Sequence, residues 1–496
     1  MAANTSWPTD AGEWRTSNPD TGLQVAPDSK SSARNLLTNG EGARYENKHR
    51  VFVLTDISNE PDDQMSLVRL LVHSNEIQIE GIAAITSVWL NYTTDLPTIH
   101  HVIDTYGDVV ENLNANVPEA GKYPTGEELL SKTYTGHPVY GLAAIGANYT
   151  TLSNASVALI NATDASEERL WVSVWGGANV LAEALNHVEK TRSAEELASF
   201  VSKLHVYSIS DQDDAGPWIR EKFPKLFYIV SLHGFSEYSQ AAWIGISGEH
   251  MRSFDVGGPD SSLVTNEWLE KNVRLGELGK QYPEFKFIME GDTPAFLSLI
   301  PNGLTQPEYP QWGGWGGRYI NVDSSGRSLV FSNTADYVVG LDNQTHASAY
   351  ATIWRWRKAF QYDFAARMAW AAYGNDTTKT NHHPVAIVNG SASLDTIKVP
   401  YRLGESLVLD ASESWDPDND DLTFSWYNYR EASIRIDGGE VPHVSPNVTI
   451  TPLNDKGSVV ELLPKDNLTL HIILTVEDDR KMNLATYRRV ILEPEA

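Results

Sequence analysis

Three aspartates lie close together in residues 50–63, which read RVFVLTDISNEPDD. A short apolar run, Val51–Leu54, precedes Asp56, and the pair Asp62–Asp63 begins six residues later. The run is typical of a buried parallel strand, and the residues after the pair carry apolar side chains at helical spacing. We therefore expect the three acids on a strand-to-helix loop, at the edge of an α/β sheet where ligands bind.

Three carboxylates within eight residues repel one another unless a positive charge lies among them. Hard cations such as Ca²⁺ and Mg²⁺ prefer oxygen ligands, so the stretch predicts a metal or catalytic site. The alternative is a solvated acidic loop that caps the next helix, because Asp is also favoured at helix N-termini.

Three further segments follow predicted strands and would meet at the same sheet edge. Val172–Asn179 (VSVWGGAN) has a Gly pair that lets backbone approach a ligand; the alternative is a tight turn with an N-cap. Met289–Pro294 (MEGDTP) carries Asp292, which is an N-cap or a metal ligand. Ser208–Trp218 (SISDQDDAGPW) is an Asx-rich turn or a sugar-binding loop. Its candidate residues are Asp211, Asp213, Asp214 and Trp218.

A glycine-rich stretch, Tyr309–Tyr319, reads YPQWGGWGGRY. Because the rings of Trp312 and Trp315 are hard to bury on such a loop, they suit stacking on sugars, with Arg318 as a polar clamp. The alternative is a loop that packs over the edge of its domain.

Composition limits the class of partner. The chain has 496 residues and a net charge of −27, which argues against nucleic acid because phosphates would be repelled. It has no cysteine and no apolar run of 18 residues, so disulfides, zinc–thiolate sites and a membrane span are not expected. The residues MAANTSWPTD at the start lack the apolar region of a signal peptide, and we expect the natural one to have been removed.

The sequence also contains ten N-x-[ST] motifs, more than we expect by chance, which favours a secreted, extracellular glycoprotein. Their asparagines are Asn4, Asn91, Asn148, Asn154, Asn161, Asn343, Asn375, Asn389, Asn447 and Asn467.

The pattern along the chain predicts an N-terminal extension (1–47), an α/β domain (48–380) and an Ig-like β-sandwich (381–496). The middle part alternates strand-like and helix-like runs, which indicates a mostly parallel sheet with flanking helices. The last part has short, turn-separated strand candidates, with the acidic turn DPDNDD at Asp416–Asp421 as a solvated turn or a Ca²⁺ site. The strands predicted for the sheet are Val51–Leu54, Ile79–Ala84, Trp171–Val174, Leu204–Ile209, Leu226–Ile229 and Phe285–Ile288.

Together these stretches resemble the nucleoside hydrolase superfold, and more closely its nucleoside-hydrolase-like relatives described as cellulose-binding proteins. The resemblance covers about residues 48–492. Its motifs are VLTDISNEPDDQMSLVRLL, LWVSVWGGANVLAEAL, VYSISDQDDAGPWIREKFP, NHHPVAIVNG and LTVEDDRKMNLATYRRVIL.

In nucleoside hydrolases a D-x-D-x-x-x-D-D cluster holds Ca²⁺. The resemblance implies Asp63, Asp292 and the Ala178 carbonyl as ligands, and Asp62 as a binder of sugar hydroxyls. An alignment without gaps puts Ser58 at the position of the catalytic base, whereas a two-residue insertion makes Asp56 the base and a ligand, as we prefer.

A second departure concerns the late His-Asp of the family, which is Gly291–Asp292 here. The missing histidine assists a departing nucleobase in nucleoside hydrolases, so its absence argues against nucleoside cleavage.

The expected function is a secreted, Ca²⁺-dependent glycoside hydrolase of plant cell-wall or related glycans, inverting because activated water attacks directly. Candidates for the general acid are Glu60, Asp213 and Asp214, and Asn179 and Asp62 are candidate sugar contacts. The alternatives are a non-catalytic cellulose- or carbohydrate-binding protein and a secreted nucleosidase.

Overall fold

The computed structural model describes residues 40–146, 148–323, 325–433 and 447–495. Its larger part is an eight-stranded sheet in the order β3-β2-β1-β4-β5-β6-β8-β7, parallel except where β7 pairs with β8. The strands are β1 (His49–Thr55), β2 (Ile77–Ala84), β3 (Thr133–Thr135), β4 (Leu170–Val174), β5 (Leu204–Ser210), β6 (Phe227–Ser231), β7 (Tyr319–Asn321) and β8 (Val330–Asn333).

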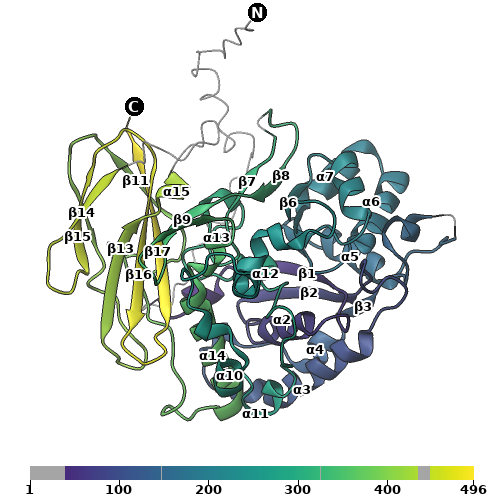
Figure 1. Ribbon diagram of the computed structural model, residues 1–496, viewed down its shortest axis with the longest axis horizontal. Helices are drawn as coiled ribbons and strands as arrows, with labels where there is room; N and C mark the ends of the chain where they lie inside the picture. The colour runs from purple at the N-terminus through teal and green to yellow at the C-terminus, as the bar shows by residue number, and fades with distance from the viewer. Residues whose placement is uncertain (1–39, 147, 324, 434–446, 496) are drawn as a thin grey trace, which may run out of the picture.

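Helices cover both faces of this sheet (Figure 1). Along β1, Val51 and Val53 face a core shared with α2, α3 and α14, whereas Phe52 and Leu54 face a core shared with α5, α6, α7 and α8. This alternation is the period of two expected of a strand buried on both sides. The helices are α2 (Pro61–Leu71), α3 (Leu96–Asn114), α4 (Gly126–Leu130), α5 (Asn154–Asp164), α6 (Asn179–Thr191), α7 (Ala194–Lys203), α8 (Ala215–Lys222), α9 (Gly248–Met251), α10 (Asn266–Asn272), α11 (Gly276–Gly279), α12 (Pro294–Leu297), α13 (Ala351–Trp354), α14 (Arg357–Tyr373) and α15 (Arg430–Ser433).

The C-terminal part is a β-sandwich with its own apolar core. One sheet has the order β11-β17-β16-β13 and the other β12-β15-β14, and a separate hairpin joins β9 (Asp336–Val339) to β10 (Thr345–Ser348). The fold class expected from the sequence is thus confirmed. The sandwich strands are β11 (Ile397–Tyr401), β12 (Leu407–Asp410), β13 (Leu422–Asn428), β14 (Val448–Pro452), β15 (Val459–Pro464), β16 (Leu470–Asp478) and β17 (Ala485–Pro494).

One predicted strand is wrong. Residues Phe285–Ile288 form no strand, and Phe287 is exposed. The backbone of the adjacent Met289 bonds instead to the hydroxyl of Ser247, which donates to its carbonyl and accepts from its N–H, both at 3.0 Å. A side chain therefore satisfies the backbone groups that a neighbouring strand would have paired.

The expectation that Trp312, Trp315 and Arg318 form an exposed sugar-binding surface is also wrong. Trp315 is fully buried, and its ring nitrogen donates to the Tyr487 hydroxyl of β17 at 3.4 Å. Trp312 is buried with its ring stacked on Tyr309 at 4.1 Å. Arg318 is buried and pairs with Asp336 at 2.6 Å. The β-sandwich packs over this loop, so the rings fill the junction between the two parts of the molecule.

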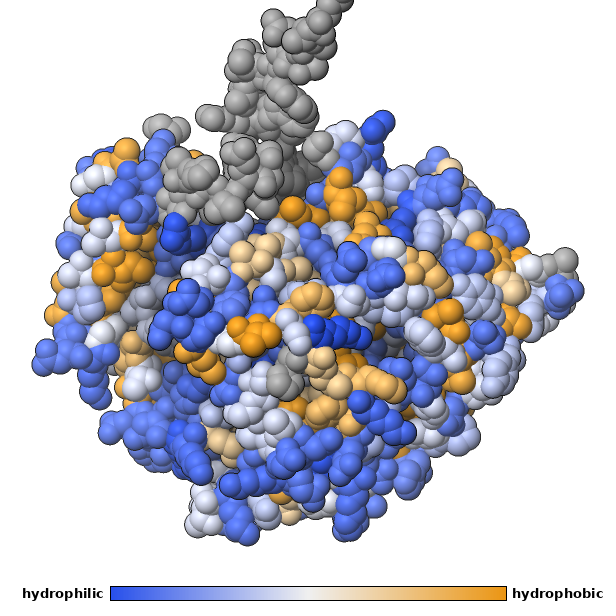
Figure 2. Space-filling view, in the orientation of Figure 1, coloured by the Kyte–Doolittle hydropathy of each residue, from blue (hydrophilic) through white to orange (hydrophobic). Residues whose placement is uncertain are grey.

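Hydrophilic residues predominate on the face of the molecule drawn in Figure 2. Figure 2 shows apolar residues in small, separate groups among hydrophilic ones on the face in view. None of the helices in the described part of the chain is long and apolar enough to cross a membrane.

The nine sequon asparagines that the structure describes are exposed, whereas Asn4 lies outside the described residues.

We expect Trp315→Ala to lower the free energy of unfolding by roughly 3–5 kcal/mol, since it leaves a large cavity in the shared core. Urea unfolding followed by circular dichroism measures the change. The control is Trp89→Ala, which removes a ring that is 53% exposed and should cost about 0.5 kcal/mol or less. Equal losses in the two variants would contradict the assignment of Trp315 to the junction core.

Candidate functional site

The acidic residues meet where the strand order reverses. Strands 3-2-1-4-5-6 form a doubly wound order, and the crevice beyond the carboxyl ends of β1 and β4 is the position at which such sheets bind ligands. Asp56 directly follows β1, the Gly176–Gly177 pair follows β4, and Asp213 follows β5. Chain topology alone therefore brings these segments to one edge.

Three buried carboxylates form the centre of the site. Oxygen atoms of Asp62, Asp63 and Asp292 all lie within 4.8 Å of one another. One carboxylate oxygen of Asp292, Oδ2, is buried and has no hydrogen-bond donor among the described residues. A compact set of buried oxygens with one left unpartnered matches the ligands that a hard cation takes. We name these three residues the acidic triad.

Burial raises the pKa of each carboxyl in the triad. The pKa of Asp62 rises to about 7, and the pKa values of Asp63 and Asp292 lie well above the ordinary value for Asp. The charged neighbours that act on all three are other carboxylates, so each raises the pKa of the next. A bound cation would remove this repulsion.

A buried ion pair holds the two halves of the triad together. Arg69 of α2, the helix that carries Asp62 and Asp63 in its first turn, pairs with Glu290 at 2.5 Å. Glu290 has a left-handed backbone (φ 57°) and accepts a hydrogen bond from Thr293, at 2.8 Å. Such a conformation in a non-glycine residue is strained and needs surrounding contacts to persist. These contacts fix the loop that presents Asp292.

Asp56 lies beside the triad rather than within it. Its Oδ2 accepts a hydrogen bond from the Ser87 hydroxyl at 2.5 Å, and burial raises its pKa to about 6. Its charge acts on all three members of the triad. Ser58 is exposed and donates its hydroxyl to Asp95 at the N-terminus of α3, at 2.5 Å. Of the two residues considered for the base, Asp56 is therefore the one whose carboxylate faces the cluster.

The glycine pair after β4 separates two buried acids. A Cβ on Gly176 would lie 2.4 Å from Asp56 Oδ1, and one on Gly177 would lie 2.4 Å from Asp213 Oδ2. No larger residue fits either position without movement. The Oδ2 of Asp213 is buried without a hydrogen-bond partner among the described residues, and burial raises the pKa of Asp213 to about 7.

Glu60 lies beside the acidic triad and is less buried than its members. It is the residue before the first turn of α2 and is half-buried. Its charge acts on Asp56 and on all three members of the triad. Burial raises the pKa of Glu60, and Arg252 acts against that shift. Asp214, by contrast, is exposed and accepts a hydrogen bond from the Leu142 N–H at 2.8 Å.

Several other candidates have structural partners. Asp211 forms a two-bond ion pair with Arg220, with both distances 2.7 Å, so its carboxylate is already neutralised. The amide of Asn179 is fully buried and donates to Thr86 at 3.0 Å, which ties loops together rather than lining a surface. Trp218 packs against Phe223 on the helical layer. The polar groups of Asp211 and Asn179 and the ring of Trp218 are therefore used in contacts within the protein. These residues are poorly placed to bind sugar.

Ala178 is the N-cap of α6, and its carbonyl accepts a hydrogen bond from the Ala182 N–H at 2.9 Å. One lone pair of that oxygen is therefore used inside the helix. Its assignment as a cation ligand stays a prediction.

An aromatic row leads from the surface to the cluster, and we did not predict it. The exposed ring of Trp89 lies 6.3 Å from Tyr238, which lies 6.3 Å from Trp243, measured between ring centroids. The ring of Trp243 closes over Gly291, at 3.0 Å from the position of a Cβ there. The available signal was the aromatic pair in the polar segment WLNYT, just beyond the end of β2.

The pKa of Asp213 predicts a pH dependence of stability. In the folded state its pKa is about 7, above the ordinary value of 3.8, so the folded state binds the proton more tightly. Its stabilising contribution is complete below about pH 4 and is lost as the pH rises through about 7. Between these pH values the unfolding free energy of wild type should fall as the pH rises. In Asp213→Asn this fall should be smaller by about 1.4 kcal/mol per pH unit, because the side chain no longer titrates.

Urea unfolding of wild type and Asp213→Asn in EDTA between pH 4.5 and 7.5 measures the difference. The control Asp108→Asn changes an exposed acid on α3 and should leave the slope unchanged. Identical slopes for wild type and Asp213→Asn would contradict the prediction.

Comparison with known proteins shows the family to which the chain belongs. The family model described as "Cellulose-binding Sde182, nucleoside hydrolase-like domain" matches residues 50–319. A second model, "Cellulose-binding protein Sde0182, C-terminal domain", matches residues 406–494. No curated protein matches the chain.

Two solved structures are similar to different degrees. One is a nucleoside hydrolase-related hypothetical protein from Saccharophagus degradans that is associated with carbohydrate metabolism; it is 31% identical, covers 90% of this chain and 100% of its own, and has a TM-score of 0.72. The other is the inosine-uridine preferring nucleoside hydrolase from Bacillus anthracis, 13% identical over 66% of this chain and 100% of its own, with a TM-score of 0.34. The match over more than half of the sequence shows that the chain belongs to the Sde182 family of nucleoside hydrolase-like, cellulose-binding proteins.

Proposed function

We propose that the protein is a cation-dependent glycoside hydrolase that acts on cell-wall or related glycans outside the cell. The observation that carries the proposal is the acidic triad, whose carboxylates are buried together with Asp292 Oδ2 unpartnered. The description of the family as cellulose-binding, and of a relative as associated with carbohydrate metabolism, supports a carbohydrate ligand. The exposed sequon asparagines support secretion.

Ca²⁺ is the cation that best fits the triad, since the site consists of carboxylate oxygens. Asp63 and Asp292 would hold it, and the Ala178 carbonyl is a further candidate. Such an ion supplies Lewis-acid activation of water at neutral pH. The carboxylate of Asp62 accepts a hydrogen bond from the Gly291 N–H. Its remaining lone pairs would accept hydrogen bonds from sugar hydroxyls.

Two carboxyl groups beside the triad can move protons. Asp56, oriented by Ser87, would accept the proton of the attacking water. Glu60, whose pKa is raised by burial, is the candidate to protonate the leaving oxygen because it is only partly buried and lies beside the triad. Asp213 is shut behind the glycine pair, which makes it a weaker candidate for that role.

The aromatic row supplies a platform for the substrate. Trp89 and Tyr238 offer ring surface next to the carboxylates, and sugar rings stack on such surfaces. Gly291 adds a second constraint, because a Cβ there would lie 2.7 Å from Asp62 Oδ2. The histidine that assists a nucleobase in nucleoside hydrolases therefore has no room here, which favours a sugar alcohol as the leaving group.

The experiment that tests the function compares wild type, EDTA-treated wild type and Asp63→Asn. We expect Asp63→Asn to lose about one bound Ca²⁺, measured by mass spectrometry, and to lose release of reducing sugar at least about 100-fold on a panel of cell-wall glycans. Asp108→Asn, an exposed carboxylate on α3, is the matched control. Full sugar release by Asp63→Asn would contradict the role of the cation.

Glu60→Gln should separate the general acid from the other carboxylates. We expect kcat/KM on a natural glycan to fall by about 10²–10⁴, and to fall much less on an aryl glycoside whose phenolate leaves without protonation. The control Glu111→Gln makes the same change at an exposed position of α3. An equal loss on both substrates would show that Glu60 does not act as the acid.

A second candidate is a non-catalytic carbohydrate-binding protein. The specific observation in its favour is that Ser58, at the position of the base in the alignment without gaps, points to Asp95 and carries no carboxylate. This function predicts binding to insoluble cellulose that survives Asp56→Asn, fails in a Trp89→Ala, Tyr238→Ala double variant, and is never accompanied by release of sugar.

A further inference from the structure

A second group of acids lies in the β-sandwich, in the turn before β13. Asp416, Asp418 and Asp420 alternate along this turn, and an oxygen of each lies within 4.8 Å of the other two. Positions 1, 3 and 5 of a loop are the spacing from which Ca²⁺-binding loops supply their first three carboxylates. The spacing alone is also compatible with a solvated turn.

Asp416 distinguishes the two possibilities because it is buried. Its side chain is 6% exposed, and Oδ1 accepts the backbone N–H groups of Asp418 and Asp420, at 2.8 and 3.2 Å. Its second oxygen, Oδ2, is buried and has no hydrogen-bond donor among the described residues. Leaving a buried carboxylate oxygen without a partner is costly, so this atom indicates a missing positive ligand. Burial also raises the pKa of Asp416 to about 6.

The basic side chains next to the cluster, Arg480 and His382, pair with Asp418 and Asp420 rather than with Asp416. Asp420 pairs with Arg480 at 2.5 Å, and Asp418 pairs with the ring of His382 at 2.9 Å and lies 3.8 Å from Arg480. A fourth carboxylate, that of Asp478, lies close enough to Asp420 for their negative charges to repel each other. Four carboxylates thus share the permanent charge of one guanidinium, and a divalent ion would balance the excess.

We propose that Asp416, Asp418 and Asp420 form a second cation site, selective for Ca²⁺, that fastens the β-sandwich to the segment joining it to α14. The three carboxylates would supply the oxygen ligands, and Asp416 Oδ2 is the atom to which no donor in the described part of the chain bonds. Ca²⁺ suits an irregular loop of this kind better than Mg²⁺, which demands near-ideal octahedral geometry.

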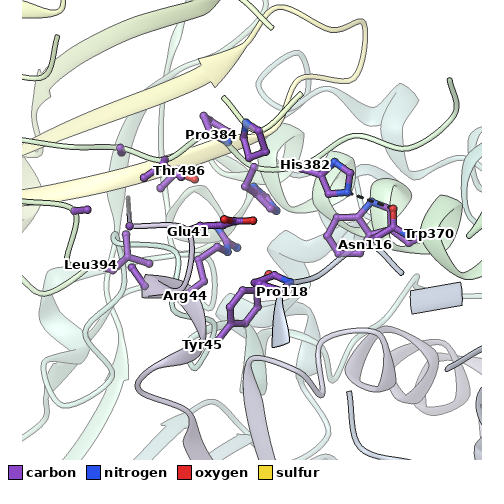
Figure 3. A pocket seen from close by; sticks show the side chains of 17 residues that line it. Glu41, Arg44, Tyr45, Asn116, Pro118, Trp370, His382, Pro384, Leu394 and Thr486 are labelled. Carbon is purple, nitrogen blue, oxygen red and sulfur yellow. Dashed lines mark hydrogen bonds between the residues drawn. The ribbon is translucent and has the colours of Figure 1, made fainter. Parts of the chain in front are cut away.

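The joining segment contacts the cluster on one side and the α/β part on the other. His382 bonds to Asp418 and stacks on Trp370 of α14, with ring centroids 5.4 Å apart. The ring of His382 also contacts the side chain of Asn116, with 3.2 Å between His382 Nε2 and Asn116 Oδ1 (Figure 3). Both residues line a cavity of about 70 Å³. Arg480 donates to the Thr380 carbonyl at 2.7 Å. An ion that orders the acidic turn would therefore order these bridging contacts as well.

The test is Ca²⁺ binding by equilibrium dialysis on the full chain after treatment with EDTA. Asp416→Asn keeps the volume and the Oδ1 acceptor but removes the charge. We expect it to bind about one Ca²⁺ fewer than wild type and to lose most of the rise in Tm that Ca²⁺ gives to wild type. Asp63→Asn, which changes the acidic triad, should retain this second ion, so failure of one site is distinguishable from failure of the other.

Asp421→Asn is the matched control, because the side chain of Asp421 is 86% exposed next to the cluster. It should bind as much Ca²⁺ as wild type. Asp420→Asn provides a second variant in case Asp416→Asn does not fold. Wild-type binding in both Asp416→Asn and Asp420→Asn, or complete loss of Ca²⁺ in Asp63→Asn, would overturn the proposal.

Discussion

The sheet edge depends on holding like-charged carboxylates together in a buried place. Repulsion and desolvation both oppose this arrangement, as the raised pKa values of Asp62 and Asp63 show. The first turn of α2 partly offsets the cost, because the positive end of a helix favours acids. Both side chains of the Arg69–Glu290 ion pair are buried. The pair fixes α2 to the loop that carries Asp292 and so holds the carboxylates in place. The cation that we propose for this site would offset the cost by balancing the charges of the carboxylates.

The second structural constraint is the junction between the α/β part and the β-sandwich. In Figure 1 the yellow strands β16 and β17 lie beside the green helices α13 and α14. Trp356 packs its ring against Tyr427, Tyr429 and Tyr487 of the sandwich. Arg489 of β17 donates to the carbonyls of Leu304 and Gly313 across the boundary. Because these contacts are buried, the two parts are expected to hold a fixed relative orientation.

Local patterns predicted the parts of the fold that short-range physics decides. The apolar run before Asp56 and the periodic run after Asp63 gave β1 and α2, and strand alternation gave the parallel sheet. The wrong predictions share a different cause. Trp315 was expected on the surface because a glycine-rich loop cannot bury a ring by itself, but β17 covers it from 170 residues further along the chain. Contacts of that range leave no trace in local spacing.

The candidate site divides in the same way. Asp56, Asp62 and Asp63 could be found because their spacing is local. Asp292 was found from its place after the predicted strand Phe285–Ile288, although that strand does not form. Asp211 looked free for sugar, yet Arg220 neutralises it from the next helix. The aromatic row was missed because Trp89 and Tyr238 are far apart in sequence and meet only through the sheet order. A rule that examines the residues after every strand adjacent to β1 would have included Trp89.

The proposal of a sugar as the leaving group rests on space as well as on charge. Trp243 and Asp62 close around Gly291 from two sides, so a larger side chain has no room at this position. Glu60 is the proton donor that we propose, because it is only partly buried beside the triad and burial raises its pKa. A carboxylic acid suits the oxygen of a departing sugar, because that oxygen needs a proton as its bond breaks. The proposed reaction would therefore transfer this proton to the oxygen of a departing sugar.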